Sequence, residues 1–427
     1  MALTLELTLN GTPLPRGRYV GWGPAPAQLR VVDPDGAVDP IPVRLDSPVG
    51  RIGSGRVVFA PQRDAEAADQ LALDLPTDGS PVDFWVLGRF QSPSRSDGDA
   101  QIRVLPAVGS TPLLSVPLMV RVRKDAQTLT VAERNRFLSA LARLNSGGFG
   151  PYQSYRDMHT DDTNDEAHSR DAFLPWHRAC LLDLERELQA IDPSVTMPYW
   201  RFDQPAPRVF SRSFMGSTES ATGTVVFTAS NPLSLFATDG QLGIVRLPFF
   251  DTRVQGAANF NGPVVAEAPV VQSQLPYTRL RPPLENNPHG RAHTSFPVGF
   301  ISQIGTAVRD PLFFLLHANV DRLWAKWQWF NKRFDPTAPT SYFFRSQAGT
   351  VGAERIGHNA PDTMWPWNDE RTNPRPPTAP RTPFPVSELA AAPGPTPTVA
   401  SMIDYQGVIS PANQLGFDYD DVPFESA

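Results

Sequence analysis

Histidine is the residue type whose spacing points most directly to chemistry in this chain. Six of the seven histidines form two groups of three, and none precedes position 159. The first group has the spacing His-x8-His-x8-His, and the second has His-x3-His-x23-His. The two groups are His159, His168 and His177, and His289, His293 and His317. Three imidazoles can hold one metal ion and leave a position open, so the pattern indicates a dinuclear site.

A purely structural role is the alternative for these histidines. One buried histidine is usually a hydrogen-bonded core residue, and a single His-x3-His pair arises easily by chance. Two triads that contain nearly every histidine of the chain are much harder to explain in this way. The seventh histidine, His358, follows Gly357 and precedes Asn359, and we expect it in a loop.

The ligand type narrows the choice of metal. Imidazole suits zinc, copper, iron and nickel, whereas hydrolytic zinc sites and di-iron sites usually add carboxylates. The segments around the triads contain no H-E-x-x-H or E-x-x-H pattern. Six neutral ligands, three for each ion, suit copper that cycles between Cu(I) and Cu(II). The spacing therefore favours a dinuclear copper site.

Helices are predicted to position most of these side chains. His177 and His317 lie near the starts of two expected helices, 175–190 and 311–330, whose remaining residues are largely apolar, so both should lie in a core. The second helix opens with Asp310-Pro311, a capping residue followed by proline at the first helical position. His289 and His293, four residues apart, would share one helix face.

The first third of the chain has a different pattern. Short alternating segments are separated by turn sequences such as Asn10-Gly11, which predicts an all-β, sandwich-like domain at 1–124 with no evident chemistry. A capping box at Thr130 and Glu133 then predicts a helix, and a mainly α domain should occupy 125–427. The proline- and threonine-rich stretch 372–397 is expected to be extended surface chain. The expected strands are 3–9, 28–32, 55–59, 84–90, 100–105 and 113–122.

The residues around the histidines resemble a known superfamily. Phe173-Leu-Pro-Trp-His-Arg178 and Asp310-Pro-Leu-Phe-Phe-Leu-Leu-His-Ala-Asn-Val-Asp-Arg-Leu-Trp324 resemble the two copper-site signatures of tyrosinases, catechol oxidases and molluscan hemocyanins. Glu285-Asn-Asn-Pro-His-Gly-Arg-Ala-His293 fits the family's H-x3-H segment, and Leu415-Gly-Phe-Asp-Tyr419 is similar to its closing motif. The resemblance covers about residues 126–420. It implies a four-helix bundle around two copper ions, as in bacterial polyphenol oxidases, here with an extra N-terminal domain.

The resemblance also implies roles for single residues. The first copper would be held by His159, His168 and His177, with His159 the least secure because the first spacing is short. The second copper would be held by His289, His293 and His317. Cys180 follows His177 by three residues and is expected to be a packed core thiol rather than a partner of a ligand histidine.

Three residues near the second triad are candidate catalytic residues. Glu285 resembles the family's glutamate that orients a water near the substrate, although a carboxylate at a helix entry is an equal alternative. Gly290 stands where efficient monophenol hydroxylases often carry asparagine, which favours o-diphenol oxidation. Thr294 is expected to face the entrance and could hydrogen-bond the substrate.

Three further positions concern support for the ligands. Leu316 replaces a histidine found in many relatives, so one hydrogen bond behind the ligands should be missing. Asp321 and Arg322 would fix the tautomer of a ligand or brace the helices, with a purely structural ion pair as the alternative.

The expected activity is oxidation of o-diphenols or o-aminophenols by O₂ to o-quinones or o-quinone imines, with weak hydroxylation of monophenols, in secondary metabolism. A hemocyanin-like dioxygen carrier and a copper-free structural relative are the alternatives.

The net charge of −6 and the pI of about 5.7 favour neither nucleic acid nor a membrane as partner. A copper chaperone and a second copy of the chain stay open as partners. The single cysteine and the absence of a signal-like N-terminus indicate the cytoplasm.

Overall fold

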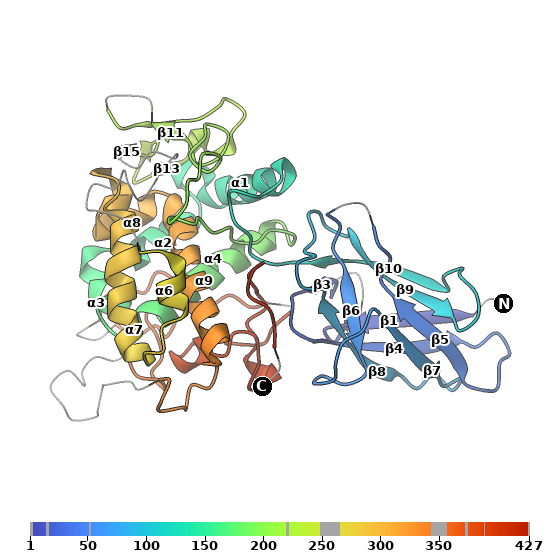
Figure 1. Ribbon diagram of the computed structural model, residues 1–427. Coiled ribbons are helices and arrows are strands. Elements are labelled where there is room, and N and C mark those ends of the chain that lie inside the picture. Colours follow the sequence, from blue (N-terminus) through green and yellow to red (C-terminus); the bar gives the residue numbers. More distant parts are fainter. Residues whose placement is uncertain are drawn as a thin grey trace.

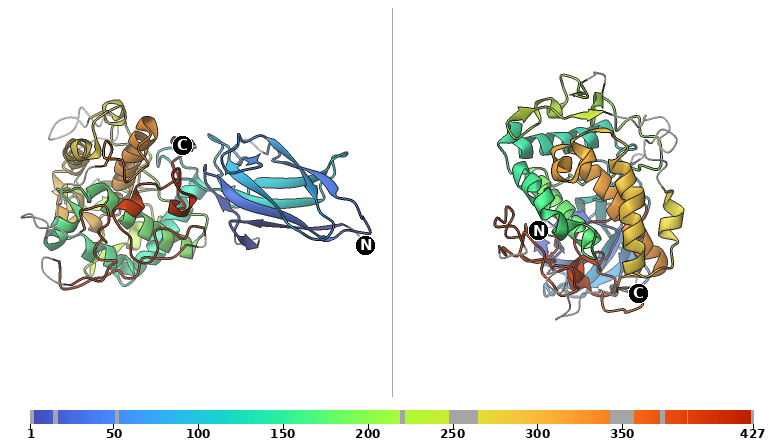
Figure 2. Two further views of the ribbon diagram at one scale, coloured as in Figure 1. Left: turned by 90° about the horizontal axis from the view of Figure 1, so that it is seen from below. Right: turned by 90° about the vertical axis from the view of Figure 1, so that its left-hand side faces the viewer.

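Strands dominate one part of the molecule and helices the other. The computed structural model describes residues 3–13, 17–50, 53–218, 222–247, 265–342, 357–371, 375–387 and 389–425. The strand-rich part extends to residue 120, and the helix-rich part begins at residue 131 (Figure 1). The two parts are joined end to end, and the C-terminal segment lies at the joint. Seen along the long axis, the strand-rich part lies behind the helix-rich part (Figure 2).

Two five-stranded sheets build the strand-rich part. Their orders are β2-β1-β4-β8-β6 and β3-β10-β9-β5-β7. Leu29 of the first sheet and Leu45 and Ile102 of the second belong to one buried core, so the sheets pack face to face. The strands are β1 (Thr4–Leu9), β2 (Thr12–Pro13), β3 (Tyr19–Val20), β4 (Ala25–Asp33), β5 (Ile41–Asp46), β6 (Val57–Ala60), β7 (Gln70–Leu75), β8 (Val82–Gly88), β9 (Ala100–Pro106) and β10 (Leu114–Val120).

The local patterns explain these strands. β4 alternates strictly between buried and exposed residues, as expected for a sheet with one face in a core. The turn at Asn10 and Gly11 has positive φ at both residues, 56° and 67°, which is the geometry of a two-residue hairpin. Each of the six expected strands overlaps an observed one, while β2, β3, β5 and β7 were not anticipated.

Two buried helices form the centre of the helix-rich part. α4 (Phe173–Ile191) and α9 (Leu312–Asn331) are buried on almost every side, so they lie inside a core and not on its surface. The other helices are α1 (Val131–Asn145), α2 (Tyr152–Met158), α3 (Asn164–Ala167), α6 (Glu267–Val271), α7 (Tyr277–Leu284) and α8 (Arg291–His293). Short strand pairs are formed by β11 (Ser217–Thr218) with β12 (Val225–Val226), β13 (Ala237–Thr238) with β14 (Gln241–Leu242), and β15 (Arg246–Leu247) with β16 (Val298–Gly299).

Helix caps follow the sequence closely. The Thr130 side chain accepts from the Glu133 backbone, and Glu133 accepts from the Thr130 backbone, which confirms the capping box that starts α1. The Asp310 carboxylate accepts from Leu312 N at 3.0 Å, and α9 begins one residue later than predicted. Asp310 also binds Arg246 through two bonds of 2.6 Å, so it anchors the helix start to β15.

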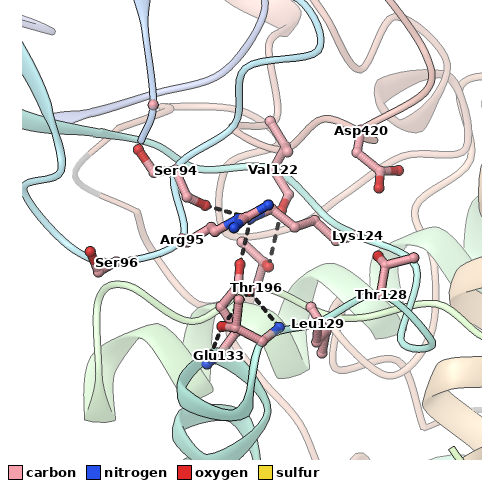
Figure 3. A network of polar contacts seen from close by, with 12 residues as sticks. Ser94, Arg95, Ser96, Val122, Lys124, Thr128, Leu129, Glu133, Thr196 and Asp420 are labelled. Atoms are coloured by element: carbon pink, nitrogen blue, oxygen red, sulfur yellow. Dashed lines mark hydrogen bonds and ion pairs between the residues drawn. The ribbon is translucent and has the colours of Figure 1, made fainter. Parts of the chain in front are cut away.

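Buried polar contacts fix the joint between the two parts. Lys124 binds both the Ser94 carbonyl of the strand-rich part and the Glu133 carboxylate of α1 (Figure 3). Trp22 donates from its backbone to Asp418 and from its indole to the Tyr419 carbonyl, each at 2.7 Å. The closing motif is therefore held between the sheets and the helices.

The segment predicted to be surface chain is only partly so. Its described residues, 375–387 and 389–397, contain no helix or strand, as expected. Arg375, Phe384 and Ala390 are nevertheless buried, and Arg381 binds the buried Asp183 at 2.6 Å. The proline content therefore predicts the lack of helix and strand in this segment, but it does not predict that side chains between the prolines are buried. In the described part of the chain, none of the helices has the length and apolar character needed to span a membrane.

Candidate metal centre

The first triad comes from three consecutive helical segments. His159 ends α2, His168 follows α3, and His177 lies in the first turns of α4. All three are buried, and each offers a ring nitrogen within 4.8 Å of the others. The structure thus brings His159 together with the other two, although its spacing made it the least secure of the three.

The second triad combines a distorted helix with α9. His289 lies in a π-helical stretch, η4 (Glu285–Gly290), and His293 ends α8, which follows it directly. The expected regular helix is interrupted at Asn287, whose φ and ψ are −147° and 112°. His317 of α9 completes the group, and these ring nitrogens also lie within 4.8 Å of one another.

The two triads face each other. The rings of His177 and His317 stack with centroids 4.1 Å apart and planes inclined by 7°, and those of His168 and His289 lie 6.2 Å apart. Because α4 and α9 carry this stacked pair side by side, the six histidines form one cluster and not two separate sites.

Backbone carbonyls orient four of the six rings. The Nδ1 atoms of His177 and His289 bond to carbonyls four residues earlier, at Phe173 and Glu285, each at 2.8 Å. The Nδ1 atoms of His159 and His293 bond to the remote carbonyls of Ile304 and Ile301, at 3.1 Å and 2.6 Å. These bonds place the proton on Nδ1 and leave the Nε2 lone pair for a metal ion.

The remaining nitrogens fit a metal better than a hydrogen-bonded core. Nε2 of His159, His177 and His289 is buried without a hydrogen-bond partner in the described structure. Nε2 of His293 and Nε2 of His317 lie 3.2 Å apart. Two imidazole nitrogens that bind one ion at about 2.0–2.1 Å in tetrahedral geometry are roughly 3.3 Å apart. Unpaired buried nitrogens are costly unless something binds them, so the cluster suits two metal ions.

The pKa values of the six histidines also favour a metal site. Burial lowers the pKa of His159 and of His293 to about 4, and it lowers the pKa of the other four histidines well below 6.5. For all of them except His293, neighbouring histidines add to this effect, because a second positive charge in the cluster would be repelled. Neutral imidazoles are the form that binds metal.

A cavity of about 610 Å³ opens onto the histidine cluster from the side of η4. This volume is in the range of small-molecule sites. The predicted catalytic residues Glu285, Gly290 and Thr294 all line it. Its other walls include Asn164, Ser169, Arg281, Asn286, Gln303 and Ile304.

Glu285 is held by two partners in this cavity. Its carboxylate accepts from Ser169 N at 2.6 Å and pairs with Arg281, four residues earlier. Burial raises the pKa of Glu285. The carboxylate does not start a helix, since α7 runs directly into η4 at this residue, and this argues against the helix-entry alternative. Sequence reasoning missed Arg281, although its i,i+4 spacing from Glu285 was a usable signal.

The other two predicted catalytic residues, Gly290 and Thr294, contact each other. The Thr294 hydroxyl donates to the Gly290 carbonyl at 2.9 Å. Gly290 has ordinary helical φ and ψ of −59° and −32°, and a Cβ added there would meet only the Glu285 carbonyl, at 3.3 Å. Gly290 is therefore not required by backbone geometry.

Asp321 and Arg322 brace the helices. Asp321 lies one turn after His317 and accepts from Arg178 at 2.6 Å, from Arg123 at 3.1 Å and from the Tyr419 hydroxyl at 2.6 Å. Arg322 binds Glu267 and Asp421. Among the described residues, the hydrogen bonds and ion pairs of Asp321 and Arg322 involve none of the six clustered histidines, which favours the bracing role over the tautomer-fixing one.

Three more predicted residues lie in the core. Leu316 is fully buried between the helices. Cys180 is buried, and burial raises the pKa of its thiol well above 9, as expected for a packed core thiol. His358 lies outside helices and strands, as expected, and its Nε2 is 2.8 Å from the Asp165 carbonyl, so it contacts the short helix α3 that precedes His168.

Comparison with known proteins gives a consistent result. The model of the common central domain of tyrosinase matches residues 150–330. A tyrosinase of Streptomyces antibioticus is 32% identical over 275 residues, which cover 58% of this chain and 93% of that protein. Grixazone synthase of Streptomyces griseus is 29% identical and is matched over 90% of its length and 52% of this chain. A functional unit of octopus hemocyanin aligns in structure with a TM-score of 0.44 at 19% identity, over 71% of this chain and 69% of that one. The buried histidine triads, the match to the tyrosinase domain model and the match to the Streptomyces antibioticus tyrosinase together show that the chain belongs to the tyrosinase family of copper-dependent oxidoreductases, which use a dinuclear copper site.

Proposed function

We propose that the protein oxidises o-diphenols or o-aminophenols with O₂, and that His159, His168, His177, His289, His293 and His317 hold its two copper ions. The observation that carries the ligand assignment is the closeness of three ring nitrogens in each triad, all within 4.8 Å of one another. The buried Nε2 atoms of His159, His177 and His289, which have no hydrogen-bond partner among the described residues, support it. Bound copper supplies dioxygen binding and accepts electrons from the phenolic substrate. The protein supplies a fixed geometry and a cavity that opens onto the cluster.

The cavity residues support oxidation of o-diphenols over hydroxylation of monophenols. Gly290 offers no side-chain amide to a water beside Glu285. Arg281 and Ser169 N already occupy part of the acceptor capacity of the Glu285 carboxylate. These two bonds stabilise the charged carboxylate and so oppose the effect of burial, which raises the pKa of Glu285. In comparison with monophenols, o-diphenols are oxidised more readily and depend less on such a base. We therefore infer weak monophenol activity.

Substrate assays on copper-loaded protein test this proposal. Each monophenol is paired with its o-diphenol and o-aminophenol, for example 4-methylphenol with 4-methylcatechol, and quinone absorbance is followed. We expect rapid turnover of the o-diphenol and a slow or lagging reaction with the monophenol. Reversible O₂ binding without turnover would favour the dioxygen carrier, and well under two coppers per chain after reconstitution would favour a copper-free relative.

The domain organisation belongs to the same proposal. We propose that the chain consists of a β domain at 1–124 and a catalytic domain at 125–427, with four helical segments around the coppers. The contacts of Trp22 and Lys124 across the joint support a scaffold role for the β domain. A place in secondary metabolism, a copper chaperone, a homo-oligomer and a cytoplasmic location stay predictions.

A further inference from the structure

A second cavity lies at the joint between the strand-rich part and α4, away from the histidine cluster. Its volume is about 350 Å³. One wall comes from β3 and the residue that follows β10, another from the C-terminal end of α4, and a third from Val386, Ser387 and Leu389. The residues that matter here are Tyr19, Arg121, Arg186, Gln189, Ser387 and Leu389, and we call this space the joint cleft.

Two arginines are buried in the joint cleft without a carboxylate partner among the described residues. Arg121 and Arg186 are each 6% exposed. Arg121 donates to the Pro193 carbonyl at 2.6 Å, and its guanidinium lies 4.7 Å from the centre of the Tyr19 ring. Arg186 donates to three carbonyls, those of Pro385, Ala392 and Leu415, at 2.7, 2.6 and 3.3 Å. Buried charges in proteins are normally paired with an opposite charge, so this arrangement is unusual.

The nearby carboxylates bind other groups. Glu185 accepts from Arg123 at 2.7 Å and 3.0 Å and from Met197 N at 2.8 Å. Asp183 binds Arg381, and Asp97 binds Arg18. Within the described ranges, the two arginines of the joint cleft therefore have carbonyl dipoles as hydrogen-bond partners, and the carboxylate of Glu185 acts on them only through space.

The pKa values of the two arginines agree with the lack of a carboxylate partner among the described residues. Burial lowers the pKa of Arg186 to about 10; repulsion from Arg121 acts in the same direction, and the charges of Glu185 and Asp183 act against it. Burial also lowers the pKa of Arg121. Arg123, which is equally buried but paired with Glu185 and Asp321, has a raised pKa instead. An anion between Arg121 and Arg186 would remove the repulsion and compensate the burial of both charges.

We propose that the joint cleft binds a small organic carboxylate, with its charged group between Arg121 and Arg186 and its apolar body against Leu389. Guanidinium groups bind carboxylates through paired hydrogen bonds. The apolar lining residues Ala190, Pro193, Val386 and Leu389 favour an organic anion over an inorganic one. The volume is also many times that of a water molecule, about 30 Å³, and lies at the lower end of small-molecule sites.

The bound anion would link the two parts of the molecule. Arg121 follows β10, whereas Arg186 lies in α4, nine residues after His177. A ligand that contacts both guanidiniums stabilises the folded chain in proportion to the logarithm of its concentration above Kd. The inference is independent of the proposed substrates, because no residue of the joint cleft lines the cavity at the histidine cluster.

Calorimetric titration of the full-length, copper-loaded protein with cyclohexanecarboxylate tests the proposal. Cyclohexanecarboxamide is the neutral control, and inorganic phosphate tests whether any anion suffices. We expect saturable binding of the carboxylate, a rise in melting temperature, no binding of the amide, and weaker binding of phosphate. No binding of the carboxylate, or equal binding of the amide or of phosphate, would overturn the proposal.

Substitutions at Ser387 locate the binding without removing either arginine. The Ser387 Oγ accepts from Leu389 N at 3.1 Å, and an aspartate or asparagine oxygen can accept the same bond. Ser387→Asp adds a carboxylate to the cleft and should weaken binding about tenfold or more, whereas Ser387→Asn should leave it unchanged. Binding at the coppers would survive in Ser387→Asp and would contradict the proposal.

Discussion

Gly290 gives the sharpest test of the proposed preference for o-diphenols. The substitution Gly290→Asn adds an amide at the edge of the catalytic cavity, next to the ligand His289. The backbone at Gly290 is helical, with φ of −59°, so asparagine adopts it without strain and should not destabilise the helix. The one close contact of an added Cβ is 3.3 Å to the Glu285 carbonyl, which a small adjustment of η4 relieves.

The expected gain follows from one hydrogen bond. A carboxylate has about four acceptor sites, and Ser169 N and Arg281 use two of those of Glu285. The new amide can therefore help to hold a water against the carboxylate. One hydrogen bond that involves a charged group contributes about 1.5 kcal/mol, which corresponds to roughly tenfold in rate. We expect Gly290→Asn to raise monophenol turnover by about that factor and to change o-diphenol turnover little.

The assay compares initial rates on 4-methylphenol and 4-methylcatechol at equal copper content. Gly290→Ala is the matched control, because it adds the Cβ without the amide and should leave the ratio of the two rates unchanged. An equal rise in the alanine variant would show that cavity shape, not hydrogen bonding, sets the preference. Rapid monophenol turnover by the unaltered protein would refute the reasoning about Gly290.

Four further predictions concern the cluster and its supports. Arg281→Met frees one oxygen of Glu285 and should raise the monophenol rate relative to the o-diphenol rate, measured in the same assay. His159→Ala should lower the copper content from about two to about one per chain by metal analysis. Asp321→Asn leaves the buried Arg178 and Arg123 without their shared charge and should lower the free energy of unfolding by about 3–5 kcal/mol in urea; a loss below about 1 kcal/mol would contradict the bracing role. Copper should be retained in dialysis at pH 5 and lost only below about pH 4, because burial lowers the pKa of His159 and of His293 to about 4 and bound copper opposes their protonation further.

Local patterns explain which features the sequence could predict. The capping box of Thr130 and Glu133, the start of α9 at Asp310 and the turn at Asn10 each depend on residues within a few positions, and the structure has all three. The six histidines were identified by spacing and by the motifs around them, and the structure places them in one cluster. Features of this kind can be predicted because their physical cause lies inside a short window of sequence.

Features that depend on remote contacts could not be predicted in this way. Asp321 binds Arg123, which lies 198 positions away in the sequence, and Glu285 accepts from Ser169 N, which lies 116 positions away. Strands β5 and β7 were missed: β5 contains Pro42, and β7 is an edge strand with mostly exposed residues. The burial within 375–397 was missed because partners such as Asp183 lie about 200 positions away on α4.

Within the metal centre too, some histidines are oriented by local contacts and others by remote ones. His177 and His289 bond to carbonyls of their own helical segments, so their orientation is fixed by local backbone alone. His159 and His293 belong to different triads, yet both depend on carbonyls of one short segment, at Ile304 and Ile301. Displacement of this segment would turn one ligand of each triad at once. The segment also lines the cavity, so a substrate that presses on it can alter the geometry of both triads together.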